Sequence, residues 1–277
     1  MPSRRAPAVD LPSCRVAPGR PVRLREIDPD GTAVFPISKE AARDELEGLT
    51  HRLTALQELL YAEHRHSVLI VLQGMDSAGK DGTIRKVFEG VNPQGVRVAS
   101  FKVPTDRERD HDFLWRVHAE LPGRGEMVLF NRSHFEDVLA PRAHGTIDRP
   151  TWLRRFRSIN AFERTIAEEG TTVLKFFLHI GRDEQKRRLE ARLQDRSKHW
   201  KFRVSDVAER RLWPRYRRAY EEAISATSTP WAPWFVVPSN HKWLRDLVVS
   251  RTIVDALEGL RMRYPPLPRE FRRLRIR

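Results

Sequence analysis

The chain has 277 residues, 40% of them hydrophobic and 32% charged, which supports a buried core and favours a soluble protein. Lysine and arginine exceed aspartate and glutamate by 51 − 37 = +14, so polyanions are expected partners, although a generally basic surface would give the same excess. A single cysteine excludes an intrachain disulfide and a cysteine-based metal cluster. Because no long apolar run and no secretory signal are visible, we expect a cytoplasmic protein without a membrane span.

The predicted elements alternate between helices and strands along the chain. Residues 1–20 are rich in proline and arginine and predict a mobile arm, and the apolar spacing over 39–64 predicts an amphipathic helix. Strand candidates are 67–72, 96–101, 127–130, 172–180 and 235–237. Helical patterns cover about 82–90, 107–121, 150–168, 183–195, 205–226 and 241–260. This alternation predicts an α/β fold, a parallel sheet with helices on both faces.

The domain organisation follows from the same pattern. We find no internal repeat and no linker that would divide the chain into two domains. We therefore predict an N-terminal arm over 1–38, one domain over 39–265 and a basic C-terminal tail over 266–277.

The first predicted strand ends in a glycine-rich loop. Gly74, Gly79 and Lys80 fit the first seven positions of the Walker A pattern. Glycines let backbone N–H groups turn around a phosphate, the following helix presents its positive end, and the lysine supplies a mobile charge. The alternative is a plain glycine turn. The phosphate-binding candidates in this segment are Gly74, Ser77, Ala78, Gly79, Lys80, Asp81, Gly82 and Thr83.

Two acids in this loop depart from the usual pattern. Asp81 stands where serine or threonine normally binds Mg²⁺, and Thr83 follows two positions late, so an ordinary ATP-hydrolysing P-loop is in doubt. Asp76 would repel phosphates unless it holds Mg²⁺ beside them. The other interpretation of Asp76 is that it caps the following turn.

The predicted strand at 127–130 usually ends, in P-loop folds, in an acid that binds Mg²⁺. Here Asn131 occupies that place, and Arg132 and Ser133 follow it. Asp137 lies further along in a predicted helix and could point back to the metal, while Arg132 could clamp a phosphate with two hydrogen bonds. The structural alternatives are a solvated helix residue for Asp137 and an ion pair for Arg132.

A basic segment at about 192–212 predicts a lid. Kinases of the P-loop fold close such a lid over the transferring phosphoryl group, which stabilises its charge and excludes water. The candidate phosphate-binding cations are Arg192, Lys198, Lys201 and Arg203. Trp200 and Phe202 lie among them and either pack the lid or stack on a base, and a nucleic-acid-binding loop would have a similar composition.

Together these residues resemble the polyphosphate kinase 2 family of thymidylate-kinase-like P-loop proteins. The matching segments are the loop over 74–83, Val91-Asn-Pro-Gln-Gly95, Phe101-Lys-Val-Pro-Thr105, Phe113-Leu-Trp-Arg116, Phe130-Asn-Arg-Ser133, Trp200-Lys-Phe202, Ala232-Pro-Trp-Phe-Val236 and Lys242-Trp243. They cover about residues 40–265, and the Ser133–Asp137 run resembles the class III branch, which phosphorylates both AMP and ADP. Other branches carry an acid where this chain has Asn131.

The resemblance implies a Mg²⁺-dependent phosphotransferase that uses polyphosphate to phosphorylate AMP and ADP. It implies that Asp76 and Asp137 serve the metal and that Lys80 and Arg132 hold phosphates, these four being the catalytic candidates. Lys102 joins the polyphosphate-binding candidates. The nucleotide-binding candidates are Asn131, Arg132, Ser133, Asp137, Trp200 and Phe202. We also expect a homo-oligomer, a dimer or tetramer, with no membrane partner and no specific nucleic acid.

Two alternatives share parts of this pattern. An ATP-dependent nucleoside monophosphate kinase has the same fold and differs in its phosphoryl donor. A non-enzymatic nucleic-acid-binding P-loop protein would explain the charge excess but not the Asp76 and Asp137 pair.

Overall fold

A five-stranded sheet lies at the centre of the computed structural model, which describes residues 14–202, 204–268 and 275. The strands are β1 (Ser67–Gly74), β2 (Val96–Ser100), β3 (Met127–Asn131), β4 (Thr171–His179) and β5 (Trp234–Pro238). All pairings are parallel, in the order β2-β3-β1-β4-β5. Every residue of β1 is buried, as expected for the central strand of a sheet covered on both faces.

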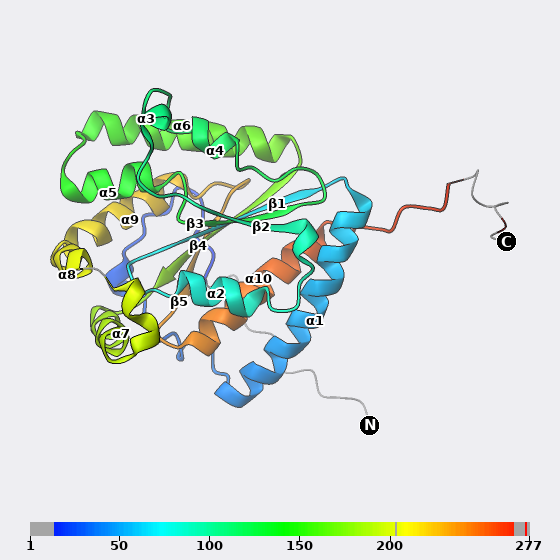
Figure 1. Cartoon of the computed structure of the whole chain (residues 1–277), viewed down its shortest axis with the longest axis horizontal. Coiled ribbons are helices and arrows are strands. Elements are labelled where there is room, and N and C mark those ends of the chain that lie inside the picture. Colours follow the sequence, from blue (N-terminus) through cyan, green and yellow to red (C-terminus); the bar gives the residue numbers. More distant parts are fainter. Residues whose placement is uncertain (1–13, 203, 269–274, 276–277) are drawn as a thin grey trace.

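Helices cover both faces of this sheet (Figure 1). On one face lie α1 (Lys39–Glu63), α2 (Lys80–Val87) and α10 (Lys242–Gly259). On the other lie α5 (Glu136–His144), α6 (Arg149–Glu168) and α9 (Trp213–Thr227). The predicted α/β fold is confirmed, and the apolar stripe that predicted the first helix supplies the buried face of α1.

The remaining helical segments are short or lie at the carboxyl end of the sheet. They are a 3₁₀ turn at Leu24–Glu26, another at Pro93–Gly95, α3 (Asp106–Arg109), α4 (Trp115–His118), α7 (Arg182–Gln194), a 3₁₀ turn at Arg196–Lys201, and α8 (Val204–Arg211). Within the described residues, none of the helices has the length and apolar character needed to cross a bilayer.

Two predicted helices are divided in the structure. The single helix expected over 107–121 is wrong: it forms α3 and α4, because the Asp112 carboxylate accepts a hydrogen bond from the Leu114 backbone N–H at 2.9 Å and starts a new turn. The single helix expected over 205–226 is also wrong. It breaks into α8 and α9 at Leu212, since Pro214 lacks the N–H that would continue the helix and is tolerated only in a first turn.

The described part of the expected N-terminal arm packs on the domain. Val16 N–H donates to Trp234 O and Val236 N–H donates to Cys14 O, both at 2.8 Å, so this segment pairs with the outer edge of β5. Leu24 and Phe35 are buried. The expectation of a mobile arm is therefore wrong for residues 14–20, because an edge strand offers unpaired backbone groups that a neighbouring segment can satisfy. Residues 1–13 and most of the predicted tail lie outside the described residues.

Candidate functional site

The phosphate-binding loop connects β1 to α2 at the carboxyl end of the sheet. Ser77 (φ 65°) and Gly79 (φ 108°) adopt left-handed backbone conformations that turn the chain back before α2. A side chain at Gly79 would collide with the Arg245 guanidinium, so only glycine fits there. The predicted loop is thus present between a strand and a helix, the context in which the Walker pattern forms an anion cradle.

Two arginines from other elements hold this loop. Arg188 of α7, only 11% exposed, donates to backbone carbonyls on two loops. These acceptors are Ser77 O, Ala78 O, Ser239 O and Asn240 O, at 2.5–3.0 Å. Arg245 of α10 also packs against Gly79 and forms an ion pair with Asp246 at 2.7 Å. Four carbonyl contacts from one planar guanidinium fix the loop in a way that a lysine ammonium could not reproduce.

Lys80 lies at the centre of a group of charged side chains. Its Nζ donates to Gly74 O at 3.0 Å. Burial, and then the nearby Arg132 guanidinium, lower the pKa of Lys80, while the carboxylates of Asp76 and Glu136 oppose that shift. A half-buried lysine at the phosphate-binding loop is placed to follow the charge of a transferring phosphoryl group.

Arg132 and Glu136 complete this group. Arg132 has a left-handed backbone (φ 65°) and lies 3.5 Å from Asp76 and 3.8 Å from Glu136, measured between guanidinium nitrogen and carboxylate oxygen. Burial raises the pKa of Glu136, although Arg132 and Lys80 counteract this. We refer to Asp76, Lys80, Arg132 and Glu136 as the charged cluster.

Asp137 has different neighbours. Its carboxylate accepts a hydrogen bond from Arg116 Nη2 at 2.8 Å, and Arg116 also donates to Lys102 O at 2.8 Å. Asp137 faces Arg116 and Glu136 faces Arg132, since successive helix residues point about 100° apart. These contacts do not test the predicted sharing of one metal site by Asp76 and Asp137, which stays a prediction. Glu136 takes the position beside Asp76. A role of Asp137 as a metal ligand stays a prediction.

Asn131, at the end of β3, contacts the other unusual residue of the pattern. Its side-chain Nδ2 donates to the Asp81 carboxylate at 2.9 Å. Ser133 is buried and hydrogen-bonds through its hydroxyl to the Gln73 amide at 3.0 Å. Thr83 is buried as well, whereas the side chain of Lys102 is exposed. These observations place Asn131 and Asp81 at the cluster and give Ser133 a supporting position behind it.

The predicted lid corresponds to the end of α7, the following 3₁₀ turn and α8. Lys198 forms an ion pair with Asp195 at 2.6 Å, Trp200 is 77% exposed, and Phe202 is half-buried. The structure does not describe the side chain of Lys201 or any part of Arg203. The phosphate-binding roles predicted for these two residues therefore lie outside the described residues. The described lid residues do not contact the charged cluster directly, so their roles and that of Arg192 stay predictions.

Several residues at this site were not predicted from the sequence. Besides Glu136, they are Gln73, Arg116, Arg188, Tyr216, Tyr220 and Arg245. Tyr220 donates to Gly74 O at 3.2 Å, and burial, together with Glu136, raises its pKa well above the ordinary value. Glu136 could have been found from its position at the start of a helix after the second strand. Arg116 lies within a matching segment and Gln73 directly precedes the loop, but neither pattern indicates a role at the site, and the other four residues lie outside the matching segments.

Comparisons with known proteins agree with this geometry. Residues 36–265 match the family model described as "Polyphosphate kinase 2 (PPK2)". The chain is 56% identical over 251 residues to "AMP/ADP-polyphosphate phosphotransferase" of Meiothermus ruber, covering 91% of this chain and 94% of that protein. It is 43% identical over 267 residues to "ADP-polyphosphate phosphotransferase" of Rhodopseudomonas palustris, covering 91% of each.

A solved structure has the same fold. The crystal structure of polyphosphate kinase 2 from Arthrobacter aurescens TC1 superimposes with a TM-score of 0.88 at 43% sequence identity, covering 92% of this chain and 91% of that one. The family-model match over residues 36–265 spans the loop, the charged cluster and the lid segment.

Proposed function

Because the chain belongs to the polyphosphate kinase 2 family, we propose that it transfers the terminal phosphoryl group of inorganic polyphosphate to AMP and ADP. The observation that carries this proposal is the charged cluster at the mouth of the phosphate-binding loop, where Lys80 and Arg132 converge. The relative named for both AMP and ADP supports the use of both acceptors.

The reaction needs little covalent chemistry from the protein. An oxygen of the acceptor's terminal phosphate attacks the terminal phosphorus of the polyphosphate, and the bond from that phosphorus to the bridging oxygen breaks. The nucleotide gains one phosphate, and the chain, shortened by one unit, leaves with the bridging oxygen. Because the attacking phosphate oxygen is already ionised near neutral pH, no strong general base is required, and catalysis depends on positioning and charge neutralisation.

The charged cluster supplies these two contributions. Lys80 and Arg132 are placed to neutralise the phosphate oxygens that carry charge in the transition state. Glu136, near both cations, holds them toward the loop mouth. Arg188 fixes the loop N–H groups before substrate arrives, so little reorganisation accompanies the reaction.

Mg²⁺ is part of this proposal. Within the described residues no three His, Cys, Asp or Glu side chains form a metal-binding group, and Mg²⁺ bound to phosphates needs only one or two protein carboxylates. The Asp76 side chain is a hard oxygen ligand, 33% exposed in the loop, and Asp81, five residues later at the start of α2, is exposed as well, so the residues fit. When bound, the metal would neutralise and orient phosphate oxygens.

We also propose a homo-oligomer, a dimer or tetramer, in the cytoplasm. The outer edge of the sheet at β2 exposes Val98 to 47%, and an open strand edge with apolar side chains is a surface that a second copy can cover. Light scattering of the purified protein across a concentration series tests this state.

A donor assay tests the proposed function. The protein is incubated with Mg²⁺, polyphosphate and AMP, ADP, GMP or GDP, and the nucleotides are separated. We expect AMP to give ADP and then ATP. Transfer from ATP with none from polyphosphate would contradict the proposal and identify a nucleoside monophosphate kinase.

A further inference from the structure

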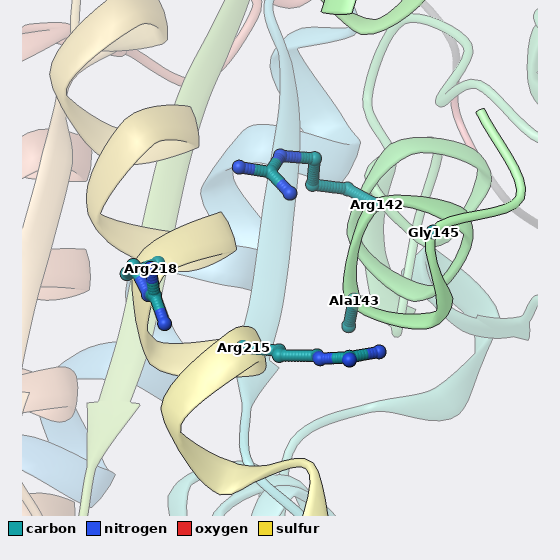
Figure 2. Close-up of a pocket in the computed structure, with 5 residues that line it drawn as sticks. All are labelled: Arg142, Ala143, Gly145, Arg215 and Arg218. Atoms are coloured by element: carbon teal, nitrogen blue, oxygen red, sulfur yellow. The ribbon is translucent and has the colours of Figure 1, made fainter. Parts of the chain in front are cut away.

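An arginine-lined pocket lies between α5 and α9, outside the charged cluster (Figure 2). Its volume is about 280 Å³. The residues that line it are Arg142, Ala143, Gly145, Arg215 and Arg218. The side chain of Arg142 extends from α5 toward α9, that of Arg215 extends from α9 toward α5, and Arg218 lies one turn along α9 (Figure 2). None of these residues belongs to a motif used above.

The charge of this pocket is only partly neutralised. Arg142 pairs with Glu222, with nitrogen–oxygen distances of 3.2 and 3.3 Å. Arg215 and Arg218 are exposed, and neither has an ion pair within the described part of the chain. Three guanidinium groups and one carboxylate leave a net charge of about +2 facing the pocket, and cations gathered in one hollow repel each other until an anion binds.

Both helices connect this pocket to the reaction centre. Glu136 begins α5 in the charged cluster, and Arg142 follows six residues later, about 9 Å along the helix axis. On α9, Tyr220 contacts the Gly74 carbonyl, and Arg215 lies five residues before it, about 8 Å away. A linear phosphate chain with one end in the loop can therefore reach the pocket with phosphates that do not react.

From these observations we infer that the Arg142, Arg215 and Arg218 pocket binds internal phosphate groups of the polyphosphate chain, several units from the transferring end. This inference rests on the proposed function and adds a second contact region to it. Arginine forks match phosphate oxygens in pairs of hydrogen bonds. Substrate affinity then increases with chain length, since only a chain long enough to fill both regions gains these contacts.

The test compares two matched double variants. Arg215→Ala with Arg218→Ala removes two charges from the pocket, and alanine preserves the helix. Lys39→Ala with Arg43→Ala removes two charges from exposed positions on α1, on the far side of the molecule (Figure 1). Each variant is assayed with long-chain polyphosphate, with tripolyphosphate and with AMP as the varied substrate.

We expect KM for long-chain polyphosphate to rise about tenfold in the Arg215→Ala, Arg218→Ala variant (the pocket variant) and not in the α1 variant. This is the effect of losing two partly exposed charge-assisted contacts. The kcat of the pocket variant and its KM for AMP and tripolyphosphate should stay near those of the unmodified protein. The slope of log KM against log salt for the long chain should become shallower by roughly one to two.

Three results would overturn the inference. The first is an unchanged KM for long-chain polyphosphate in the pocket variant. The second is an equal rise of that KM in the α1 variant, which would indicate an effect of general surface charge. The third is a rise in KM for AMP instead, which would assign the pocket to the nucleotide phosphates. Failure of the proposed function is distinguishable, because binding of fluorescently labelled long-chain polyphosphate can be measured without nucleotide. Binding about tenfold weaker in the pocket variant supports the site even if no transfer occurs, and equal binding contradicts it.

Discussion

Asn131 Nδ2 donates a hydrogen bond to the Asp81 carboxylate at 2.9 Å, so the two residues that depart from the usual P-loop pattern are partners. In that pattern a hydroxyl lies at the loop position and a carboxylate at the end of the neighbouring strand. Here the carboxylate comes from the loop and the neutral hydrogen-bonding group from the strand. The carboxylate of Asp81 therefore compensates for the carboxylate that Asn131 lacks, and one negative charge is kept where the loop meets the end of β3.

The first prediction reverses this pairing. Asn131→Asp places two carboxylates within hydrogen-bonding distance, and their repulsion should lower the thermal unfolding midpoint by roughly 2–4 °C without Mg²⁺. Because a divalent cation between them relieves the repulsion, Mg²⁺ should raise the midpoint of this variant more than that of the unmodified protein. Asn131→Ala, which removes the bond without adding charge, should not gain this Mg²⁺ response. Identical Mg²⁺ responses of the two variants would show that Asp81 and residue 131 are not near a metal.

The second prediction concerns Lys80. Lys80→Met keeps most of the side-chain volume but removes the charge that follows the phosphoryl group, so kcat should fall about 10²-fold. The thermal midpoint should not fall, because burial already lowers the pKa of Lys80 and holding its charge in the folded protein is costly. Steady-state kinetics and thermal unfolding measure the two effects. A kcat within threefold of normal would mean that this loop does not bind the reacting phosphate.

The third prediction separates the roles of Asp76 and Asp137. Asp76→Asn loses a hard anionic ligand, so its activity should require more Mg²⁺ and recover partly as Mg²⁺ is raised. Asp137→Asn instead weakens the buried ion pair with Arg116, whose side chain is 8% exposed, so this variant should unfold at a lower temperature. Activity against Mg²⁺ concentration and thermal unfolding are measured for both. Recovery of Asp137→Asn by Mg²⁺, with no loss of stability, would make Asp137 a second metal ligand.

A fourth prediction follows from His134, which lies buried in a network beneath the cluster. Its Nε2 lies 3.2 Å from a Glu163 oxygen, and Lys175 pairs with Glu163 at 2.5 Å. Burial lowers the pKa of His134 from 6.5, while the hydrogen bond to Glu163 counteracts part of that shift. Below pH 6.5 the unfolded chain therefore binds a proton that the folded protein does not. The free energy of unfolding should fall as the pH drops below 6.5, by up to about 1.4 kcal/mol per pH unit for one proton.

His134→Gln tests this dependence. Glutamine can still donate to Glu163 but does not titrate, so the variant should lose less stability than the unmodified protein between pH 6.5 and lower pH. His51→Gln, at an exposed position of α1, is the control and should leave the profile unchanged. Denaturant unfolding across this pH range gives the slopes, and equal slopes for the His134 variant and the unmodified protein would contradict the assignment.

The sequence by itself determined the order of the elements and the phosphate-binding loop. Both depend on local information: the apolar periodicity of α1, the continuous apolar run of β1, and the glycines that turn the chain before Lys80. Neighbouring residues fix these features through backbone geometry and side-chain burial, whatever the rest of the chain does.

Only the tertiary structure decided which side chains meet at the loop. Glu136 and Asp137 are adjacent in the chain, yet helix geometry points them about 100° apart, and the packing of α5 against α9 selects Glu136 for the cluster and Asp137 for Arg116. Arg188, Arg142 and Arg215 belong to no recognised motif. The elements that they face lie far from them in the sequence. Contacts between residues far apart in sequence depend on how whole helices pack, and a local sequence pattern does not predict the relative orientation of two packed helices.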